Sequence, residues 1–439
     1  MLKDTILSFS HYFRRLADDI VGRLFKDSFW SFWGSLVNQF LGLIVGVIAS
    51  RILGRIQYGE YGIILNTVNL LAVLVGLGFN VTAIRYTSQN RVINSYEVGK
   101  IILSLLLINL GMAILGAGIY ILSAPWLAHR ILNAPGLTLY IQWSGLLLIA
   151  RVLLGVISGF MIGMEWFRWT AFTNIVILIV GMPITVLLIS EYKIIGAINS
   201  QLFLCLFSIF LYGYRIFLYF KRENIPWAFL RWPEIYKLVI FSLPAYVSLI
   251  LVYPFSWLTN TFLVQQKDGY AQMGVVNAIM QIKNIVLFIP GVISQAVIPT
   301  LSDLYVNHSR DQILKVITFS CGLIILALLP IGAVMLLFPN ITLGIFGHEF
   351  QGYSKELSLF IGSYIIMGVI APISQVILVT GKMWIGVFVN LIWGILLVSI
   401  SWYLIWSGNG AEGLAIANLI SNLVLAFLHI PILLRLLPT

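Results

Sequence analysis

Long apolar blocks recur along the chain, and short stretches with charges, proline, glycine or asparagine separate them. Each block has about 20 residues, the length that a helix needs to cross ~30 Å of hydrocarbon. The blocks lie near residues 28–50, 61–84, 98–122, 140–163, 169–190 and 194–218, then near 237–264, 270–298, 313–338, 356–379, 383–406 and 412–435. The pattern therefore predicts an all-α membrane protein with about twelve transmembrane helices.

The largest inner break, Lys221 to Lys237, contains two prolines and divides the predicted helices six and six. One stretch of each half matches the other at an offset of 216: Ile157-Ser158, Phe172 and Asn174 against Ile373-Ser374, Phe388 and Asn390. Because each half has an even number of spans, a pseudo-two-fold axis along the membrane normal relates the two lobes. The expected parts are a cytoplasmic amphipathic N-terminal segment (1–27), a first six-helix lobe (28–220), a cytoplasmic linker (221–236) and a second six-helix lobe (237–439).

The N-terminal segment mixes charges with apolar residues and offers no signal-peptide cleavage site, so we expect it to stay attached. Its apolar residues recur at three- and four-residue steps: Ile6, Phe9, Phe13, Leu16, Ile20 and Leu24. This spacing predicts a helix on the membrane surface, and a basic topogenic tail is the alternative.

Composition supports membrane insertion and sets the orientation. Apolar residues make up 60% of the 439 positions and charged residues only 10%, against roughly 45–50% and 25% in soluble domains. With a cytoplasmic N-terminus, the inner segments hold 17 of the 26 Lys and Arg residues and the outer segments hold six. The positive-inside rule thus predicts a multi-pass protein of the cell (inner) membrane with both termini in the cytoplasm.

The charges placed deep inside the spans are basic, because all 16 acidic residues fall in loops or at span ends. Arg151 lies midway along the fourth span and Lys283 midway along the eighth. Each costs about 2.5–3.5 kcal/mol in hydrocarbon and therefore needs a polar cavity or a partner. One face of the fourth span carries Ser144, Arg151, Gly155, Ser158 and Glu165. This face is either the wall of a wet cleft or the seat of a buried arginine with Glu165 as a distant partner.

Other polar side chains follow the same helical spacing. Asn277, Gln281, Asn284 and Gln295 share a face of the eighth span, and Lys283 lies at its border. The second span carries Asn66, Asn69, Gly76 and Asn80 on one side. The candidate substrate-binding residues are therefore Arg151, Lys283, Asn66, Asn69, Ser158, Asn277 and Gln281, with Arg51 and Arg85 at the two mouths. Lys283 either lines a cavity or snorkels beside it.

The first outer turn reads Arg51-Ile52-Leu53-Gly54-Arg55-Ile56-Gln57-Tyr58-Gly59-Glu60-Tyr61-Gly62, and Gly76-Leu77-Gly78 and Ala83-Ile84-Arg85 follow. This stretch resembles the polysaccharide transporter family of the multidrug/oligosaccharidyl-lipid/polysaccharide flippase superfamily, sharply over residues 28–90 and only in architecture beyond. The glycines also suit a tight re-entry between two helices. The resemblance implies alternating access and a polyprenyl-pyrophosphate-linked oligosaccharide moved from the cytoplasmic to the outer leaflet. Thr259, Asn260 and Thr261 depart from the acidic end that the seventh span often has in this family, which puts ion coupling there in doubt.

Three functions compete. A flippase fits the deep cations, whereas a multidrug/cation antiporter of the same superfamily normally needs a carboxylate in the first or seventh span. A membrane glycosyl transferase or polymerase needs an acid or base in a sizeable outer loop, where His129, His348 and Glu349 are the candidates. We expect no enzyme, no catalytic residue, no metal and no cofactor, because phosphate-loop and metal-ligand motifs are missing from the sequence. The expected partners are a lipid-linked anionic glycan, the bilayer and polysaccharide assembly enzymes, with no nucleic acid.

Overall fold

The chain folds into helices in a computed structural model, which describes residues 2–91, 93, 95–225, 228–306 and 310–437. Side chains are described from Trp30 onward, except at 31, 232, 235, 237–245 and 248–249 within helices, so those of the predicted amphipathic segment lie outside the described set. The α-helices are α1 (Leu2–Gly76), α2 (Phe79–Asn90), α3 (Ser95–Trp126), α4 (Thr138–Gly163), α5 (Phe167–Val176), α6 (Met182–Arg222), α7 (Trp232–Val264), α8 (Gly269–Val286), α9 (Phe288–Val306), α10 (Arg310–Leu337), α11 (Pro339–Gly344), α12 (Ser354–Val379), α13 (Met383–Leu404) and α14 (Gly410–Leu436).

Eight continuous helical stretches in the described ranges are long and apolar enough to cross a membrane. Three of them contain a turn and so cross twice: Phe32–Gly76 turns at Gly54, Phe167–Arg222 at Lys193 and Met383–Leu436 at Gly408. The helix α7, with the shorter apolar stretch Ile250–Val264, adds one more crossing. The prediction of an all-α protein with about twelve transmembrane helices is confirmed.

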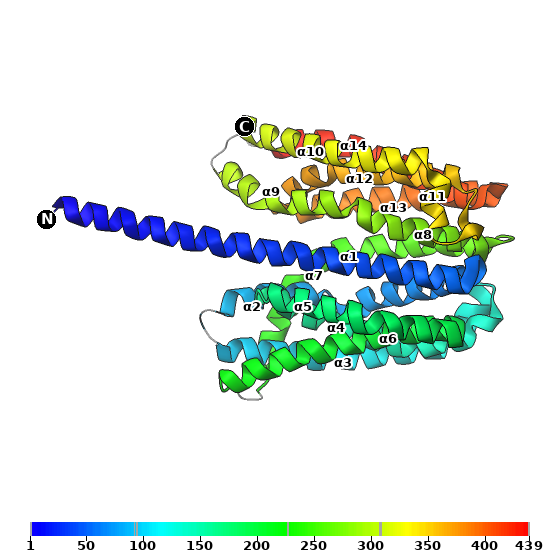
Figure 1. Ribbon diagram of the computed structural model, residues 1–439, viewed down its shortest axis with the longest axis horizontal. Coiled ribbons are helices and arrows are strands. Elements are labelled where there is room, and N and C mark those ends of the chain that lie inside the picture. Colours follow the sequence, from blue (N-terminus) through cyan, green and yellow to red (C-terminus); the bar gives the residue numbers. More distant parts are fainter. Residues whose placement is uncertain (1, 92, 94, 226–227, 307–309, 438–439) are drawn as a thin grey trace.

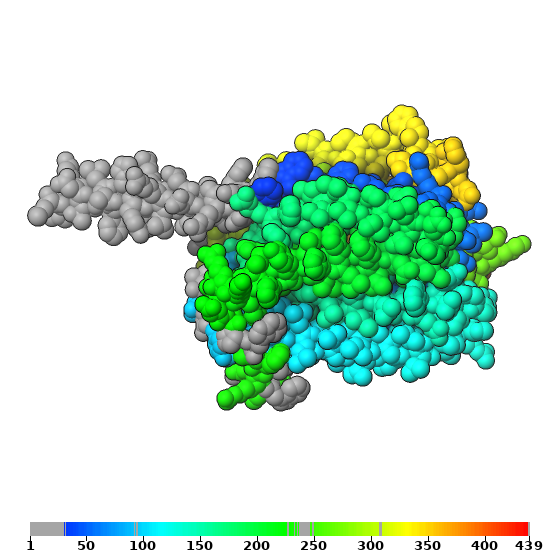
Figure 2. Space-filling view, turned by 60° about the horizontal axis from the view of Figure 1, so that its bottom comes forward, coloured from blue at the N-terminus to red at the C-terminus, as the bar shows by residue number. Residues whose placement is uncertain are grey.

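The helices form two lobes, which appear as the lower and upper bundles in Figure 1. The lower bundle contains α2 to α6, and the upper one contains α8 to α14, with α7 packed chiefly on α13. The long helix α1 runs between them, packs on α4, α5 and α6, and makes its most extensive contact with α8. Figure 2 shows the described part of α1, in dark blue, between the green α5–α6 surface and the yellow α10. The predicted two-lobe architecture is thus confirmed.

One end of the molecule, here called the Gly54 end, is where α1 turns at Gly54; the other, the termini end, is where α1 begins and α14 ends (Figure 1). A single hydrophobic core crosses both lobes at the Gly54 end and includes Leu53, Val276 and Phe350. At the termini end the cores are separate, with one around Phe160 in the first lobe and another around Leu301 in the second. The lobes thus share a hydrophobic core at the Gly54 end, whereas at the other end each lobe has its own core and they meet through local contacts such as the Phe32–Phe288 ring pair, with centroids 5.4 Å apart.

Two glycines make this junction possible. Gly54 has φ 69°, the left-handed conformation that lets α1 reverse within one residue. Gly59 faces α8 so closely that a Cβ there would lie 1.8 Å from the Tyr270 carbonyl oxygen. The contact is reciprocal, because a Cβ at Gly274 on α8 would lie 2.1 Å from the Arg55 carbonyl oxygen. Gly54 therefore supplies a positive φ and Gly59 a close backbone approach, which are two reasons why a tight re-entry between helices uses glycine.

Hydrogen bonds between the lobes close the Gly54 end further. The Ser50 hydroxyl donates to the Phe346 carbonyl at 2.9 Å, and the Arg51 Nε donates to the Ile345 carbonyl at 2.8 Å. The Arg55 backbone N–H donates to the Glu349 carboxylate at 3.0 Å. Together these bonds tie the first turn of the first lobe to the α11–α12 loop of the second.

Candidate functional site

Arg151 lies halfway along α4 and is held by amides from two other helices of the first lobe. Its guanidinium donates to the side-chain oxygen of Asn69 on α1 and, at 3.2 Å, to that of Gln201 on α6. No carboxylate in the described ranges lies within 4 Å of it, and its buried Nε has no hydrogen-bond partner. The amides orient the charge but do not neutralise it, so the arginine keeps an unsatisfied donor for an anion.

A cavity of about 280 Å³ opens beside Arg151, between the first lobe and α7 of the second. It is lined by Ala72, Val73, Gly76, Gly78, Asn80, Asn109, Arg151, Val152, Gly155, Val156, Tyr246 and Tyr253. Asn109 on α3 is fully buried, and its side-chain oxygen accepts no hydrogen bond. The Tyr246 hydroxyl donates to the Leu74 carbonyl, which fixes α7 against α1. The cavity is thus bordered by one residue with an unpartnered donor, Arg151, and one with an unpartnered acceptor, Asn109.

A second, larger cavity of about 640 Å³ lies in the half of the first lobe nearer the termini end. It is lined by Trp30, Gly34, Ser35, Asn38, Leu154, Ser158, Met161, Ile162, Phe167, Thr170, Asn174, Ser208, Tyr212 and, from α9, Gln295. None of these residues carries a charge. Hydroxyls and amides dominate the polar part of the wall, and such groups suit the hydroxyls of a sugar.

The predicted face of the fourth span is divided between these two cavities. Arg151 and Gly155 line the smaller one and Ser158 lines the larger one. Ser144 lies deeper, buried against the Tyr120 hydroxyl at 3.1 Å. Glu165 is not the partner of Arg151, because it forms an ion pair with Arg91 at the termini end.

Lys283 lies on α8 of the second lobe, where its Nζ is 5.9 Å from the ring centroid of Tyr364 on α12. It is half-buried, and it does not line either of the two cavities. Its neighbours Asn277 and Gln281 face α1: Asn277 donates to the Tyr58 carbonyl at 3.3 Å, and Gln281 fills the space beside Gly46. In this conformation these two amides hold the lobes together.

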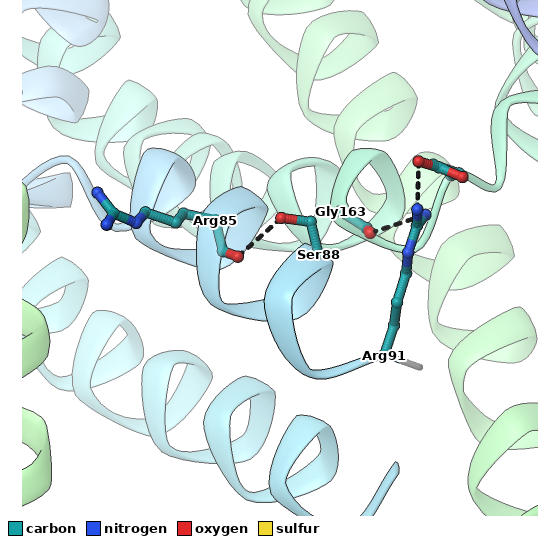
Figure 3. A network of polar contacts seen from close by, with 5 residues as sticks. Arg85, Ser88, Arg91 and Gly163 are labelled. Carbon is teal, nitrogen blue, oxygen red and sulfur yellow. Dashed lines mark hydrogen bonds and ion pairs between the residues drawn. The ribbon is translucent and has the colours of Figure 1, made fainter. Parts of the chain in front are cut away.

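The remaining candidates separate by position. Asn66 lies one turn from Asn69 on α1, and its buried side-chain nitrogen has no partner. Arg51 lies at the Gly54 end and lines a groove of about 360 Å³ with His348 and Glu349. Arg85 lies at the termini end on α2, and its side chain extends away from Ser88 and Arg91 (Figure 3). The structure brings Arg151 and Asn69 together and keeps Arg51 and Arg85 at opposite ends.

Sequence reasoning missed Gln201, which accepts from Arg151, and Asn109 and Tyr246, which line the cavity beside it. Asn109 and Gln201 are amides inside apolar spans, which is the signal that identified Asn69. Asn260, noted only as a departure from the family pattern, is buried with an unpartnered side-chain oxygen. In the part of the chain that the structure describes, no three His, Cys, Asp or Glu side chains come together as metal ligands would.

Comparisons with known proteins identify the family and the fold of the chain. The sequence profile described as "Polysaccharide biosynthesis protein" matches residues 24–305. No curated protein matches the chain.

Solved structures share the fold at low sequence identity. A multidrug resistance MATE family transporter of the MOP superfamily, in an inward-facing conformation, is 14% identical, with a TM-score of 0.75 over 91% of this chain and 94% of that one. The outward-facing conformation of a MATE family transporter of this superfamily has a TM-score of 0.62 and 15% identity, over 94% of this chain and 95% of that one. A MOP superfamily transporter from Pyrococcus furiosus, described as having a binding pocket of reverse polarity, has a TM-score of 0.66 and 15% identity, over 93% of this chain and 94% of that one. The chain therefore belongs to the polysaccharide biosynthesis protein family, and it is a multi-pass membrane protein with the fold of the MOP superfamily transporters.

Proposed function

We propose that the protein is a flippase that moves a polyprenyl-pyrophosphate-linked oligosaccharide from the cytoplasmic to the outer leaflet by alternating access. The observation that carries this proposal is Arg151, a cation deep in the first lobe that lacks a described carboxylate partner and borders a cavity between the lobes. A diphosphate is expensive to place in hydrocarbon, and a pre-oriented guanidinium offsets part of that cost.

The two cavities suit the two parts of such a substrate. Arg151 offers its unpartnered Nε to a phosphate oxygen, while the unpartnered oxygen of Asn109 accepts from a hydroxyl. The uncharged wall around Ser158 and Asn174 leaves the sugar held by many weak contacts. Lys283 is a second cation of the pathway, and we expect it to meet the head group when the lobes rearrange. Arg51 lies at the Gly54 end of the proposed transport pathway, and Arg85 lies at its termini end.

The conformation agrees with a cycle that begins at the cytoplasmic side. The excess of Lys and Arg in one set of loops orients the termini end toward the cytoplasm. A shared hydrophobic core and hydrogen bonds join the lobes at the Gly54 end. In this orientation the Gly54 end faces outward. The higher TM-score with an inward-facing transporter, 0.75 against 0.62, supports the same reading. The protein thus receives its substrate from the cytoplasmic leaflet of the inner membrane.

Cation antiport is the competing function, because the fold is shared with multidrug transporters. A cation carrier needs an anionic group beside its cargo, and neither the Arg151 cavity nor the cavity around Ser158 is lined by a carboxylate. The polarity of the site therefore favours an anionic cargo.

Proteoliposomes with purified protein distinguish the two. A fluorescent polyprenyl-pyrophosphate-linked oligosaccharide is placed in both leaflets, and an impermeant quencher reports how fast the inner pool reaches the outside. We expect the wild type and Arg222→Gln to speed this exchange, since Arg222 is exposed at the end of α6, and Arg151→Glu to remain at the protein-free rate. Uptake of a cationic dye without lipid exchange would reverse the assignment.

A further inference from the structure

A group of arginines and tryptophans gathers on the first lobe at the termini end, next to the cavity around Ser158 but lined by different residues. It forms a hollow of about 290 Å³ lined by Glu165, Trp166, Arg168, Trp169 and Arg215. The residues come from the junction of α4 with α5 and from the last third of α6. The hollow therefore lies where a helix end meets the head-group layer of a membrane.

The Arg215 guanidinium is held by ring faces and not by acids. Its Cζ lies 4.6 Å from the ring centroid of Trp166 and 5.8 Å from that of Trp169. Among the residues that the structure describes, no carboxylate forms an ion pair with it and no hydrogen bond engages its N–H groups. Stacking uses the face of a guanidinium and leaves the donors at its edge free for a second ligand.

Glu165, the acid among the described residues that line the hollow, is already neutralised. The Arg91 guanidinium donates to the Glu165 carboxylate and, at 3.4 Å, to the Gly163 carbonyl (Figure 3). The Cζ of Arg168 lies 5.3 Å from the ring centroid of Trp30, and no carboxylate in the described ranges forms an ion pair with Arg168 either. Once the Arg91–Glu165 pair is set aside, the hollow keeps two uncompensated positive charges.

The tryptophans are fixed, so the hollow is built and not induced. The Trp169 indole N–H donates to the Leu211 carbonyl at 3.3 Å. Trp166 packs edge to face against Phe160 and Tyr219, with centroids 5.8 and 5.4 Å apart. Indoles of this kind anchor a protein at the depth of the lipid head groups.

The surface beside the hollow is apolar. Phe172 on α5 is 53% exposed, and its ring centroid lies 5.7 Å from that of Trp169. A ligand seated on the arginines would therefore rest its remaining length against this exposed aromatic ring. The phosphate head group and the acyl chains of a phospholipid meet these two requirements together.

We infer that this hollow is a binding site for an anionic phospholipid, whose phosphodiester accepts from the edges of Arg168 and Arg215 while its chains lie along Phe172. Basic pockets between helices at a membrane surface bind anionic head groups in this way. The lipid anchors the junction of α4, α5 and α6 to the leaflet at the termini end, beside the cavity around Ser158.

Native mass spectrometry of the purified full-length protein in detergent tests the site. The protein is titrated with dioleoyl phosphatidylglycerol, with dioleoyl phosphatidylcholine, and with polyprenyl phosphate as a separate arm. We expect phosphatidylglycerol to bind at least about fivefold more tightly than phosphatidylcholine, about the contribution of one arginine at a membrane surface. Arg168→Gln/Arg215→Gln should lose this preference, while Arg222→Gln should keep it.

A charge-preserving variant distinguishes loss of the two charges from misfolding. Arg168→Lys/Arg215→Lys retains both charges and should retain the preference at lower affinity, because an ammonium cannot offer the planar fork of a guanidinium. The inference is overturned if the wild type shows no preference, if the glutamine pair keeps it, or if polyprenyl phosphate binds and phosphatidylglycerol does not.

Discussion

The reciprocal contact between α1 and α8 at the Gly54 end gives a sharp prediction for Gly59→Ala. The new Cβ would lie 1.8 Å from the Tyr270 carbonyl oxygen and 2.9 Å from the Gly274 nitrogen. A carbon needs ~3.3 Å from such an oxygen, so α8 must move by about 1.5 Å. These are backbone atoms and cannot rotate aside. Overpacking of this kind costs about 1–3 kcal/mol, and the movement also weakens the bond from Asn277 to the Tyr58 carbonyl.

Only the joined state carries this cost, so the ratio of joined to open molecules should fall by about fivefold to more than 100-fold. Spin labels at Leu139→Cys on α4 and Ile341→Cys on α11, which are 60% and 68% exposed, report the separation by double electron-electron resonance. Both native cysteines are replaced by serine. Gly42→Ala on the same helix is the control, since a Cβ there meets nothing within 4 Å. An unchanged distance distribution in Gly59→Ala, or equal opening in Gly42→Ala, would refute the reasoning.

Three further outcomes are expected. Glu349→Ala leaves the Arg55 N–H without its charged acceptor, which should cost the joined state about 1.5–3 kcal/mol and lengthen the same spin-label distance; no lengthening would contradict this. Arg151→Glu and Lys283→Glu should abolish lipid exchange in proteoliposomes without loss of insertion, and Lys283→Arg should retain more activity, whereas survival of both reversals would make these residues structural. Reporter fusions at the C-terminus and near Arg222 should both report the cytoplasm, and an external signal from either would overturn the proposed orientation.

Local pattern predicted most of the fold. The apolar blocks located the crossings, and even the turn at Lys193 falls between the blocks 169–190 and 194–218. The ends of the helices were less predictable. The eighth span was expected to stop at residue 298, one residue before Pro299, but α9 continues through this proline to Val306. A proline near a membrane helix end is tolerated when neighbouring groups satisfy the freed carbonyl, and the sequence does not reveal those neighbours.

The site was predictable only in part, because pairing between helices is absent from any one-dimensional pattern. Arg151 stood out as a charge in an apolar block, and Asn69 as a polar residue on the right face. Glu165 shared that face but lies fourteen residues away, about 21 Å along the helix, beyond the reach of the guanidinium. The chain instead turns at Glu165, with φ 56°, toward Arg91. The roles of Asn109 and Gln201 depend on α3 and α6 packing on α4, which only the structure supplies.

The most direct test of the account is the affinity of detergent-purified protein for a polyprenyl-pyrophosphate-linked oligosaccharide, measured for the wild type, Arg151→Gln and the surface control Arg222→Gln. A charge-assisted hydrogen bond contributes about 1.5–3 kcal/mol, so Arg151→Gln should raise the dissociation constant by about tenfold or more, with Arg222→Gln unchanged. A dissociation constant for Arg151→Gln within about twofold of the wild-type value, less than 0.5 kcal/mol, would contradict the claim that this arginine holds the anionic head group.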